Sequence, residues 1–499
     1  MPIPKEILAV ERPKNSIVIA YGKNRDRYAV RARIGCRSDG DRRLPVNGPT
    51  IGHIVGGRYV PLEEEACRPV SASAVDLKDW ANVVLAQKLF GNMLDELREV
   101  YDSDDALKIW CIAVLRVCFG GIKDCELKDA YEESFLSELH PGVALSRNTV
   151  SAFLNDLGRT CSKITLFMRS RTARVGLDHH LLIDGTLKSD ESRVNSLSDF
   201  SRKARTKGTR DISVLYAYDL EAEEPVCSKC FPGNMLDVTA YNEFISVHHI
   251  TKGIVVADKG FPQSAAKQHF QENPDLHYLN PLKRDSRMAS DLHMLEFTAL
   301  LGGYEGITYR KERAPDGRFL YSFRDAYRAA KEESDWLKRS RKKNDYSLAG
   351  LQKARAVFGT VVLECDLDTD AETIYKAYSK RWEIELVMRF YKSALEFDET
   401  RVHDDYSVIG SEFCDFLSSV LTFRMIRAFD EAKLLEQMTY KKIMKTLARA
   451  KMFNDPARGW HLIRINPSYE EILKRLDIHP TEKLQPKKKR GRPPKIKHV

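Results

Sequence analysis

Strand-like and helix-like runs alternate between Leu177 and Lys283, and this alternation constrains the fold more than any other feature of the sequence. Apolar runs predict strands at 180–184, 212–219, 225–231, 253–258 and 277–282, and helical periodicity occupies 239–250 and 262–271. Asp237 or Thr239 is placed to cap the first of these helices. Three strands, a helix, a strand, a helix and a strand predict an α/β core with a mixed sheet and helices on both faces, over residues 176–400.

Two of the expected strands end in an aspartate. Asp184 follows the apolar run of the first strand, and Asp258 directly follows the run that ends at Ala257. Open α/β sheets place their sites at the C-terminal ends of strands, so the two carboxylates are candidates for one site. Each aspartate taken alone is also compatible with a residue that only opens a turn.

The stretch from about residue 285 to residue 360 interrupts the alternation. Two runs, 307–313 and 318–323, flank the turn sequence Ala314-Pro315-Asp316-Gly317 and predict a hairpin. A basic helical stretch then leads to a short strand at 360–365, and a long helix begins near Ala371. We therefore expect a β-containing insertion within the α/β core.

The long helix after the insertion carries Tyr378, Arg381, Glu385 and Lys392. At about 100° per residue these four positions fall within about 60° of one another, whereas Glu383 points about 160° away from Glu385. An acid among three donors on one stripe is typical of a site that binds phosphate. The alternative is a solvated helix face whose charged residues only pair with each other.

Asp184, Asp258 and Glu385 together make a set of three carboxylates. Carboxylate oxygens hold Mg²⁺ or Mn²⁺ and leave room for a substrate phosphate. Cleavage of a phosphodiester needs an activated water or hydroxyl, a stabilised leaving oxygen and positive charge near the phosphorus. The three acids and the neighbouring Arg381 and Lys392 satisfy these requirements, which predicts metal-dependent phosphodiester chemistry.

The spacing on the helix is Tyr, two residues, Arg, three residues, Glu, six residues, Lys. Together with Asp184 in Ile-Asp-Gly-Thr and Asp258 in Ala-Asp-Lys-Gly-Phe, it resembles the bacterial insertion-sequence transposases that carry an Asp-Asp-Glu set on a ribonuclease H-like fold. The separations between the acids, 74 and 127 residues, are also similar to those of this family. The resemblance covers roughly residues 177–395.

The resemblance implies a cut-and-paste DNA transposase. Asp184, Asp258 and Glu385 would coordinate two divalent ions, Mg²⁺ with Mn²⁺ as a substitute, and Tyr378 and Lys392 would grip the phosphate backbone near the cut end together with Arg381. Water would attack at the element end, and the freed 3′-hydroxyl would then enter target DNA by transesterification. The implied partners are double-stranded terminal repeats, target DNA and a second copy in a homodimer. A metal-dependent nuclease and a catalytically silent, transposase-derived DNA-binding protein stay as alternatives.

The regions before the α/β core predict two further units. Residues 16–60 alternate apolar and polar positions between turn-forming clusters, which predicts a small β-rich unit at 1–75. Helical spacing then predicts a helical domain at 76–170, and the resemblance implies that this domain binds DNA. One of its helix faces carries Leu107, Trp110, Cys111, Val114, Leu115 and Cys118. A helical region is also expected at 401–480, after the core.

A helix in the second of these units is a candidate for DNA recognition as part of a helix-turn-helix. Ser146 is placed to cap it, and Arg147 and Asn148 would stand at its exposed start. Arginine pairs with guanine and asparagine with adenine in the major groove. The alternative is a capped surface helix without contact to DNA.

The C-terminal segment concentrates positive charge. The chain has a net charge of +9, and Pro486–Val499 contains seven basic residues and no acidic one. Arg490-Gly491-Arg492-Pro493 looks like an AT-hook, in which Arg490 and Arg492 would enter the narrow minor groove of A·T-rich DNA. Residues 481–499 are therefore expected to be a disordered, DNA-binding tail, with a merely solubilising tail as the alternative.

Other features of the sequence predict reduced cysteines and no membrane-spanning helix. Ten cysteines among 499 residues form no dense framework, and no leader-like run is found near Met1, so we expect a reduced, cytosolic compartment. The resemblance to the insertion-sequence transposases implies a bacterial, nucleoid-associated protein of the cytoplasm. Apolar helical stretches such as 106–119 contain charges and are too short to cross a bilayer. Cys227 and Cys230 have no second pair at zinc spacing, and the pairs His179-His180 and His248-His249 receive no role.

Overall fold

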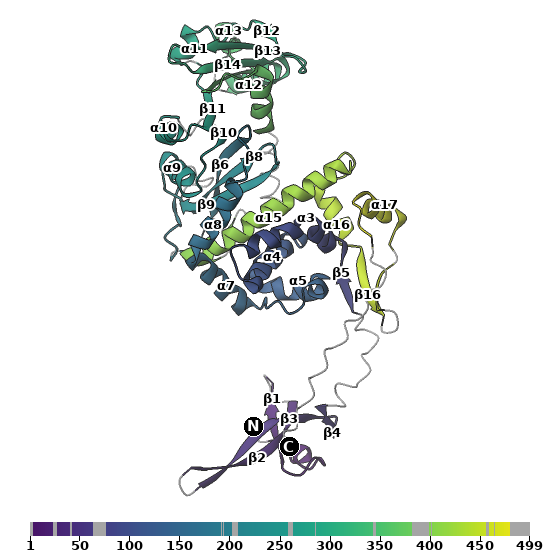
Figure 1. The fold of residues 1–499 in the computed structure, drawn as a ribbon. Helices are drawn as coiled ribbons and strands as arrows, with labels where there is room; N and C mark the ends of the chain where they lie inside the picture. The colour runs from purple at the N-terminus through teal and green to yellow at the C-terminus, as the bar shows by residue number, and fades with distance from the viewer. Residues whose placement is uncertain are drawn as a thin grey trace, which may run out of the picture. The chain divides into compact units, whose positions relative to one another are not determined.

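The computed structural model describes most of the chain. The described residues are 3–22, 27–39, 42–62, 76–190, 192, 194–201, 208–257, 263–284, 286–342, 346–381, 399–400, 402–455, 459–463 and 465–479. They form two compact units, Met1–Asp76 and Leu77–Val499 (Figure 1).

The first unit is an antiparallel sheet of four strands in the order β1-β2-β3-β4. The strands are β1 (Ser16–Tyr21), β2 (Arg27–Asp39), β3 (Arg42–Val55) and β4 (Arg58–Pro61), and the short helix α1 (Lys5–Leu8) precedes them. Val18, Val30 and Ile54 form a small core under Ile3 and Ile7. The β structure predicted for residues 16–60 is confirmed.

The second unit is built on a mixed sheet of ten strands in the order β12-β13-β14-β15-β11-β10-β6-β8-β7, with β9 also paired to β8. Its strands are β6 (His180–Ser189), β7 (Asp199–Phe200), β8 (Arg210–Asp219), β9 (Glu224–Pro232), β10 (Gly253–Ala257), β11 (Leu276–Leu282), β12 (Ala299–Leu300), β13 (Ile307–Arg313), β14 (Phe319–Asp325) and β15 (Thr360–Cys365). β6, β10 and β11 run parallel, and the remaining pairings are antiparallel. The mixed α/β fold predicted from the alternation is confirmed.

Two helices connect the parallel strands. They are α9 (Asp237–Val247) and α10 (Gln263–Glu272), which lie where the sequence predicts them. The capping of α9 was wrongly predicted: its N-cap is Leu236, whose side chain makes no capping hydrogen bond. Asp237 is instead the first helical residue, where a negative charge still favours the helix N-terminus.

The predicted insertion continues the main sheet. Its hairpin, β13 and β14, is confirmed, and β15 pairs with β14 on one side and with β11 on the other. Helices α11 (Arg287–Asp291), α12 (Ala326–Lys342) and α13 (Leu348–Arg355) accompany these strands. Met294, Leu320 and Val362 belong to a separate small core in this part.

A helical layer packs against the sheet and is centred on α15 (Asp405–Glu431), which is buried along most of its length. α15 contacts α3 (Ala81–Arg98), α4 (Ser103–Cys118), α7 (Arg147–Arg159), α8 (Cys161–Thr172) and β9. The prediction of one apolar face on α4 was too narrow, because residues 109–118 are buried all around the helix. α4 is covered by α3 and α15 and by the short helix α5 (Leu127–Glu133).

A small three-stranded sheet joins the two ends of the second unit. β5 (Leu77–Asp79) pairs with β16 (Lys451–Asp455), which pairs with β17 (Gly459–Leu462). The region predicted as helical at 401–480 therefore contains two strands besides α15, α16 (Tyr440–Leu447) and α17 (Pro467–Arg475). None of the helices in the described ranges is both long and apolar enough to span a membrane.

Candidate catalytic site

Asp184 lies on β6, a central strand of the main sheet. Leu181 to Ile183 are fully buried, whereas Asp184 is half-buried and its Oδ1 accepts a hydrogen bond from the Gly185 amide at 2.8 Å. The prediction that the strand ends at Asp184 was wrong. β6 continues to Ser189 because residues 185–189 keep pairing with β8. The Asp-Gly sequence therefore does not open a turn here.

β10, the strand that precedes the second predicted aspartate motif, runs parallel to β6. Ala257, the last residue of β10, pairs with Ile183, the residue directly before Asp184. Asp258 follows Ala257 in the sequence and lies outside the described residues. Ala257, the only described residue of the second motif, therefore lies beside Ile183 of the first motif.

The helix predicted after the insertion is present at residues 371–381. Tyr378 is 9 % exposed and lines a cavity of about 550 Å³ together with Tyr375 and with Arg328 and Lys331 of α12. Burial lowers the pKa of Arg328, but hydrogen bonds to Tyr378 and Glu332 outweigh this and hold the pKa above its usual value. Arg381 is half-buried at the end of the described helix, and Glu385 and Lys392 lie outside the described residues.

The residues that flank the undescribed stretch 382–398 are linked by hydrogen bonds to the two ends of β6, on one side through Leu220 and on the other side directly. On one side, Lys380 Nζ donates to Leu220 O at 2.8 Å, and the Leu220 amide donates to His180 O at 2.9 Å. On the other side, the Thr400 amide donates to Ser189 O at 2.8 Å. His180 and Ser189 are the first and last residues of β6, so the chain leaves the described region near one end of this strand and returns at the other.

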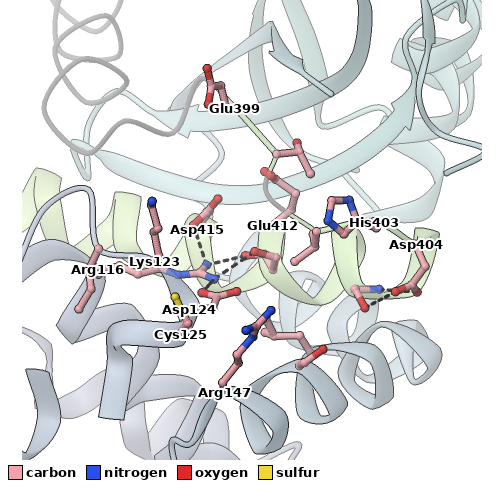
Figure 2. A pocket seen from close by; sticks show the side chains of 17 residues that line it. Arg116, Lys123, Asp124, Cys125, Arg147, Glu399, His403, Asp404, Glu412 and Asp415 are labelled. Carbon is pink, nitrogen blue, oxygen red and sulfur yellow. Dashed lines mark hydrogen bonds and ion pairs between the residues drawn. The ribbon is translucent and has the colours of Figure 1, made fainter. Parts of the chain in front are cut away.

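A buried ionic network fixes β6 to α15. Lys188 is 2 % exposed, and its Nζ lies 2.6 Å from the Glu412 carboxylate and 2.9 Å from that of Asp415. Arg116 of α4 reaches the same Asp415 at 2.7 Å and Asp124 at 2.9 Å (Figure 2). Burial alone would lower the pKa of Lys188, but the two carboxylates raise it above its usual value, so the lysine stays charged.

This network bears on Asp184 through the period of the strand. Side chains alternate between the faces of a sheet, so Asp184, Thr186 and Lys188 point to the same side of β6. Lys188 contacts α15, and Asp184 therefore faces the α15 side of the sheet. The network therefore fixes β6 at Lys188, which lies four residues along the strand from Asp184, the candidate catalytic residue.

The part of the chain that holds the candidate site matches a known family. Residues 176–407 match the family model described as the transposase DDE domain. The match supports a transposase, and the matched residues, called here the transposase segment, include the positions of Asp184, Asp258 and Glu385.

No curated protein matches the chain. Among solved structures, the piggyBac transposase synaptic complex with hairpin DNA, determined by cryo-EM, is similar with a TM-score of 0.38 and 12% sequence identity. The alignment covers 74% of this chain and 80% of that chain. At this TM-score the similarity carries no argument about the site.

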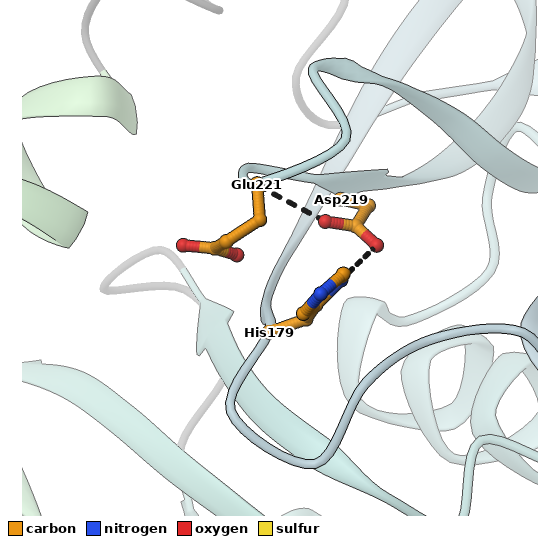
Figure 3. A group of neighbouring side chains, drawn as sticks. All are labelled: His179, Asp219 and Glu221. Carbon is orange, nitrogen blue, oxygen red and sulfur yellow. Dashed lines mark hydrogen bonds and ion pairs between the residues drawn. The ribbon is translucent and has the colours of Figure 1, made fainter.

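The transposase segment contains an acidic cluster that the sequence did not reveal. His179 Nδ1 bonds Asp219 Oδ2 at 2.7 Å, and each of His179, Asp219 and Glu221 offers a ligand atom within 4.8 Å of the others (Figure 3). Burial lowers the pKa of His179, but the bond to Asp219 raises it above its usual value. His179 and Asp219 are 40 residues apart and meet because β6 pairs with β8, so no local spacing could have indicated them.

Internal hydrogen bonds already occupy this cluster. Asp219 Oδ1 accepts from the amides of Glu221 and Ala222, and Glu221 Oε2 accepts from the His180 amide at 2.6 Å. The three side chains have the chemistry to hold a metal ion. Their present bonds close the turn after β8 at the His180 end of β6.

The helix predicted to recognise DNA lies outside the transposase segment. α7 begins at Arg147, and the predicted cap is confirmed because Ser146 Oγ accepts from the Thr149 amide. Arg147 and Asn148 are exposed at its first turn, and Arg147 lines a cavity of about 480 Å³ next to the Arg116 network (Figure 2). Arg490 and Arg492 of the predicted AT-hook lie outside the described residues.

Proposed function

We propose that the protein is a DDE transposase that cleaves DNA at element ends and joins the freed 3′-hydroxyl to target DNA. The observation that carries this proposal is the parallel pairing of Ala257 with Ile183 within the transposase segment. The residues that follow them, Asp258 and Asp184, are thereby assigned to one carboxylate site at adjacent strands. A carboxylate pair of this kind suits a hard divalent cation.

The order of strands supports a ribonuclease H-like core. β9, β8 and β6 form an antiparallel meander, and β10 and β11 follow in parallel beyond β6. This order is the one that the resemblance to the Asp-Asp-Glu transposases leads us to expect. β13 and β14 then extend the sheet as the insertion between the second and third acid.

We assign Glu385 as the third carboxylate. Its segment connects Arg381 to Glu399. Lys380 is linked through Leu220 to one end of β6, the strand that carries Asp184, and Thr400 bonds the other end directly. This connection supports a site shared by Asp184, Asp258 and Glu385.

The three carboxylates would hold two Mg²⁺ ions, with Mn²⁺ as a substitute, and the ions when bound activate water or a 3′-hydroxyl and stabilise charge on the phosphate. The protein's own residues orient and neutralise the DNA backbone. Tyr378 is hydrogen-bonded to Arg328 and shares its cavity with Lys331 and with the carboxylates of Asp325, Glu332 and Asp335, so the two cations there are partly neutralised, and the Tyr378 hydroxyl is the group that would contact the DNA backbone. Arg381 and Lys392 would add charge along the same helix.

The proposal also includes further contacts with DNA and between two copies of the protein. Arg147 and Asn148 at the start of α7, and Arg490 and Arg492 in the tail, would bind duplex DNA at the terminal repeats or nearby. A homodimer would pair the two element ends, and the protein would act at the bacterial nucleoid.

The test is cleavage and joining of a labelled duplex carrying the DNA that flanks the reading frame, with Mg²⁺ or Mn²⁺. We expect Asp184→Asn and Glu385→Gln to lower cleavage by at least about 10³-fold, because each removes a metal ligand. Duplex binding should remain. Asp275→Asn is the matched control, because Asp275 is exposed at the start of β11 in the same segment.

The outcomes separate the candidate functions. Cutting and joining by the wild-type protein and by Asp275→Asn, but not by the two site variants, supports the transposase. Cutting without joining indicates a nuclease, and binding without cutting indicates a silent DNA-binding protein. Wild-type rates in Asp184→Asn would show that the site is placed wrongly.

A further inference from the structure

The first unit carries a two-stranded ribbon that projects beyond its four-stranded part. β1 pairs only with residues 27–32 of β2, and β4 pairs only with residues 52–55 of β3. Residues 33–39 and 42–49, called here the ribbon, therefore pair only with each other among the described strands, and their last pair is Asp39 with Arg42. β2 and β3 are 13 and 14 residues long, against 6 for β1 and 4 for β4 (Figure 1).

The two long strands are strongly basic. They contain six arginines, no lysine, and one acidic residue, Asp39. The arginines are Arg27, Arg31, Arg33, Arg37, Arg42 and Arg43. By register, Arg37 lies opposite Leu44, and Ser38 lies opposite Arg43, so positive positions occur on both strands of the ribbon.

Three of these arginines have described side chains, and none of the three contributes a hydrogen bond or ion pair to the fold of the first unit. Arg27, Arg31 and Arg33 are exposed, and within the described ranges their side chains make no hydrogen bond or ion pair. A structural arginine would be expected to pair with a carboxylate, as Arg116 does in the second unit. The row of unpaired guanidinium groups indicates a polyanionic partner.

The sequence of β3 argues against a protein strand as that partner. Pro45 and Pro49 remove two backbone donors from the ribbon, and a strand that adds to a sheet edge needs these donors. A bulge in the pairing between Arg33 and Gly35 further breaks the regular edge. The ribbon is therefore suited to contact through its side chains rather than through its backbone.

We infer that the ribbon is a DNA-binding element that lies in the major groove of duplex DNA. The major groove of B-form DNA is wide enough for a two-stranded ribbon, and arginine supplies both phosphate contacts and bidentate pairing to guanine. The inference rests on the proposed function for the identity of the polyanion. It places a DNA contact in the first unit, in addition to α7 and the tail.

The test compares two double variants of the full-length protein that lose the same charge. Arg33→Ala/Arg37→Ala changes the ribbon, and Lys14→Ala/Arg58→Ala changes exposed positions of the same unit outside it. Binding to the duplex from the flanking DNA is measured by fluorescence anisotropy in EDTA, so that cleavage does not contribute. We expect the ribbon variant to lose roughly 10-fold or more in affinity and about two units of salt slope, and the control to stay within about 2-fold.

A second measurement locates the contact. A photoreactive residue at Ile34, which is 66% exposed in the ribbon, should cross-link to DNA, whereas the same residue at Val55, which is 45% exposed at the far end of β3, should not. Equal losses in both double variants, or no loss in either, would overturn the assignment of the ribbon.

The result is independent of catalysis. If the wild-type protein binds and cuts DNA but the ribbon variant is unaffected, the ribbon assignment fails and the proposed function stands. If the wild-type protein binds no duplex, both fail. Far-ultraviolet circular dichroism of each variant establishes that the first unit remains folded.

Discussion

At the scale of single residues, the sequence assigned no role to His248, and its burial in the structure makes it a residue whose protonation opposes folding. His248 ends α9, is 2 % exposed and packs against the Phe244 ring with 4.8 Å between ring centroids. Burial, aided by the nearby cations Lys229 and Arg169, lowers the pKa of His248 to about 3. The imidazole is therefore neutral in the folded protein at any pH at which the protein would work.

This burial makes stability depend on pH in a defined direction. The unfolded chain takes up a proton on His248 near pH 6.5, and the folded chain only near pH 3, so the stability is present above pH 6.5 and is lost as the pH falls. We expect the free energy of unfolding to fall by about 1.4 kcal/mol per pH unit below pH 6 relative to His248→Phe. Urea denaturation of the wild-type protein and of His248→Phe between pH 7 and pH 5 measures this difference in the free energy of unfolding.

A control variant separates this effect from the titration of other groups. His479→Phe removes an exposed histidine, and its pH dependence should match that of the wild-type protein. If His248→Phe also follows the wild-type curve, the buried histidine does not couple to folding.

At the scale of elements, two glycines set how closely α7 and α15 approach. A Cβ on Gly158 would lie 1.8 Å from Tyr406 O, and a Cβ on Gly410 would lie 2.1 Å from Leu154 O. Each position therefore faces the backbone of the other helix, which cannot move aside as a flexible side chain would. The close crossing holds the exposed start of α7, with Arg147, against the layer that covers the sheet.

We expect Gly410→Ala to lower the free energy of unfolding by about 1–3 kcal/mol or more, because the added methyl group forces the two helices apart. Gly91→Ala in α3 is the matched control. Its added Cβ would meet only the end of the Gln87 side chain at 3.2 Å, and alanine favours a helix by about 1 kcal/mol over glycine. Thermal denaturation of both variants tests this difference, and equal midpoints would mean that the helices adjust.

The elements also show which features a sequence can reveal. The Ser146 cap and the β13–β14 hairpin were predicted correctly because their signals lie within a few residues. The end of β6 was predicted wrongly because its extension to Ser189 depends on pairing with β8, more than twenty residues later. The same long-range pairing creates the contact between His179 and Asp219. Asp184 was identified as a candidate, but its neighbour in space, Ala257, follows only from the parallel pairing.

At the scale of the whole molecule, the transposase segment shares its core with residues outside it. One continuous set of buried side chains includes Trp110 of α4, Leu181 of β6 and Leu417 of α15. α15 lies almost wholly beyond residue 407, and it contacts both β9 and the helices of residues 81–172. The first unit, by contrast, has its own core of Val18, Val30 and Ile54.

These cores predict which parts of the chain fold alone. A protein of residues 77–499 keeps the main core whole and should unfold cooperatively with nearly the wild-type midpoint. A protein of residues 176–407 lacks the partners of β9 and the Glu412 and Asp415 carboxylates that hold Lys188, so it would leave a buried charge unpaired and a large apolar face exposed. We expect it to aggregate or to show no cooperative transition by circular dichroism in urea. A sharp transition for residues 176–407 would show that the sheet is stable without α15, and the network around Lys188 would then be dispensable for the candidate site.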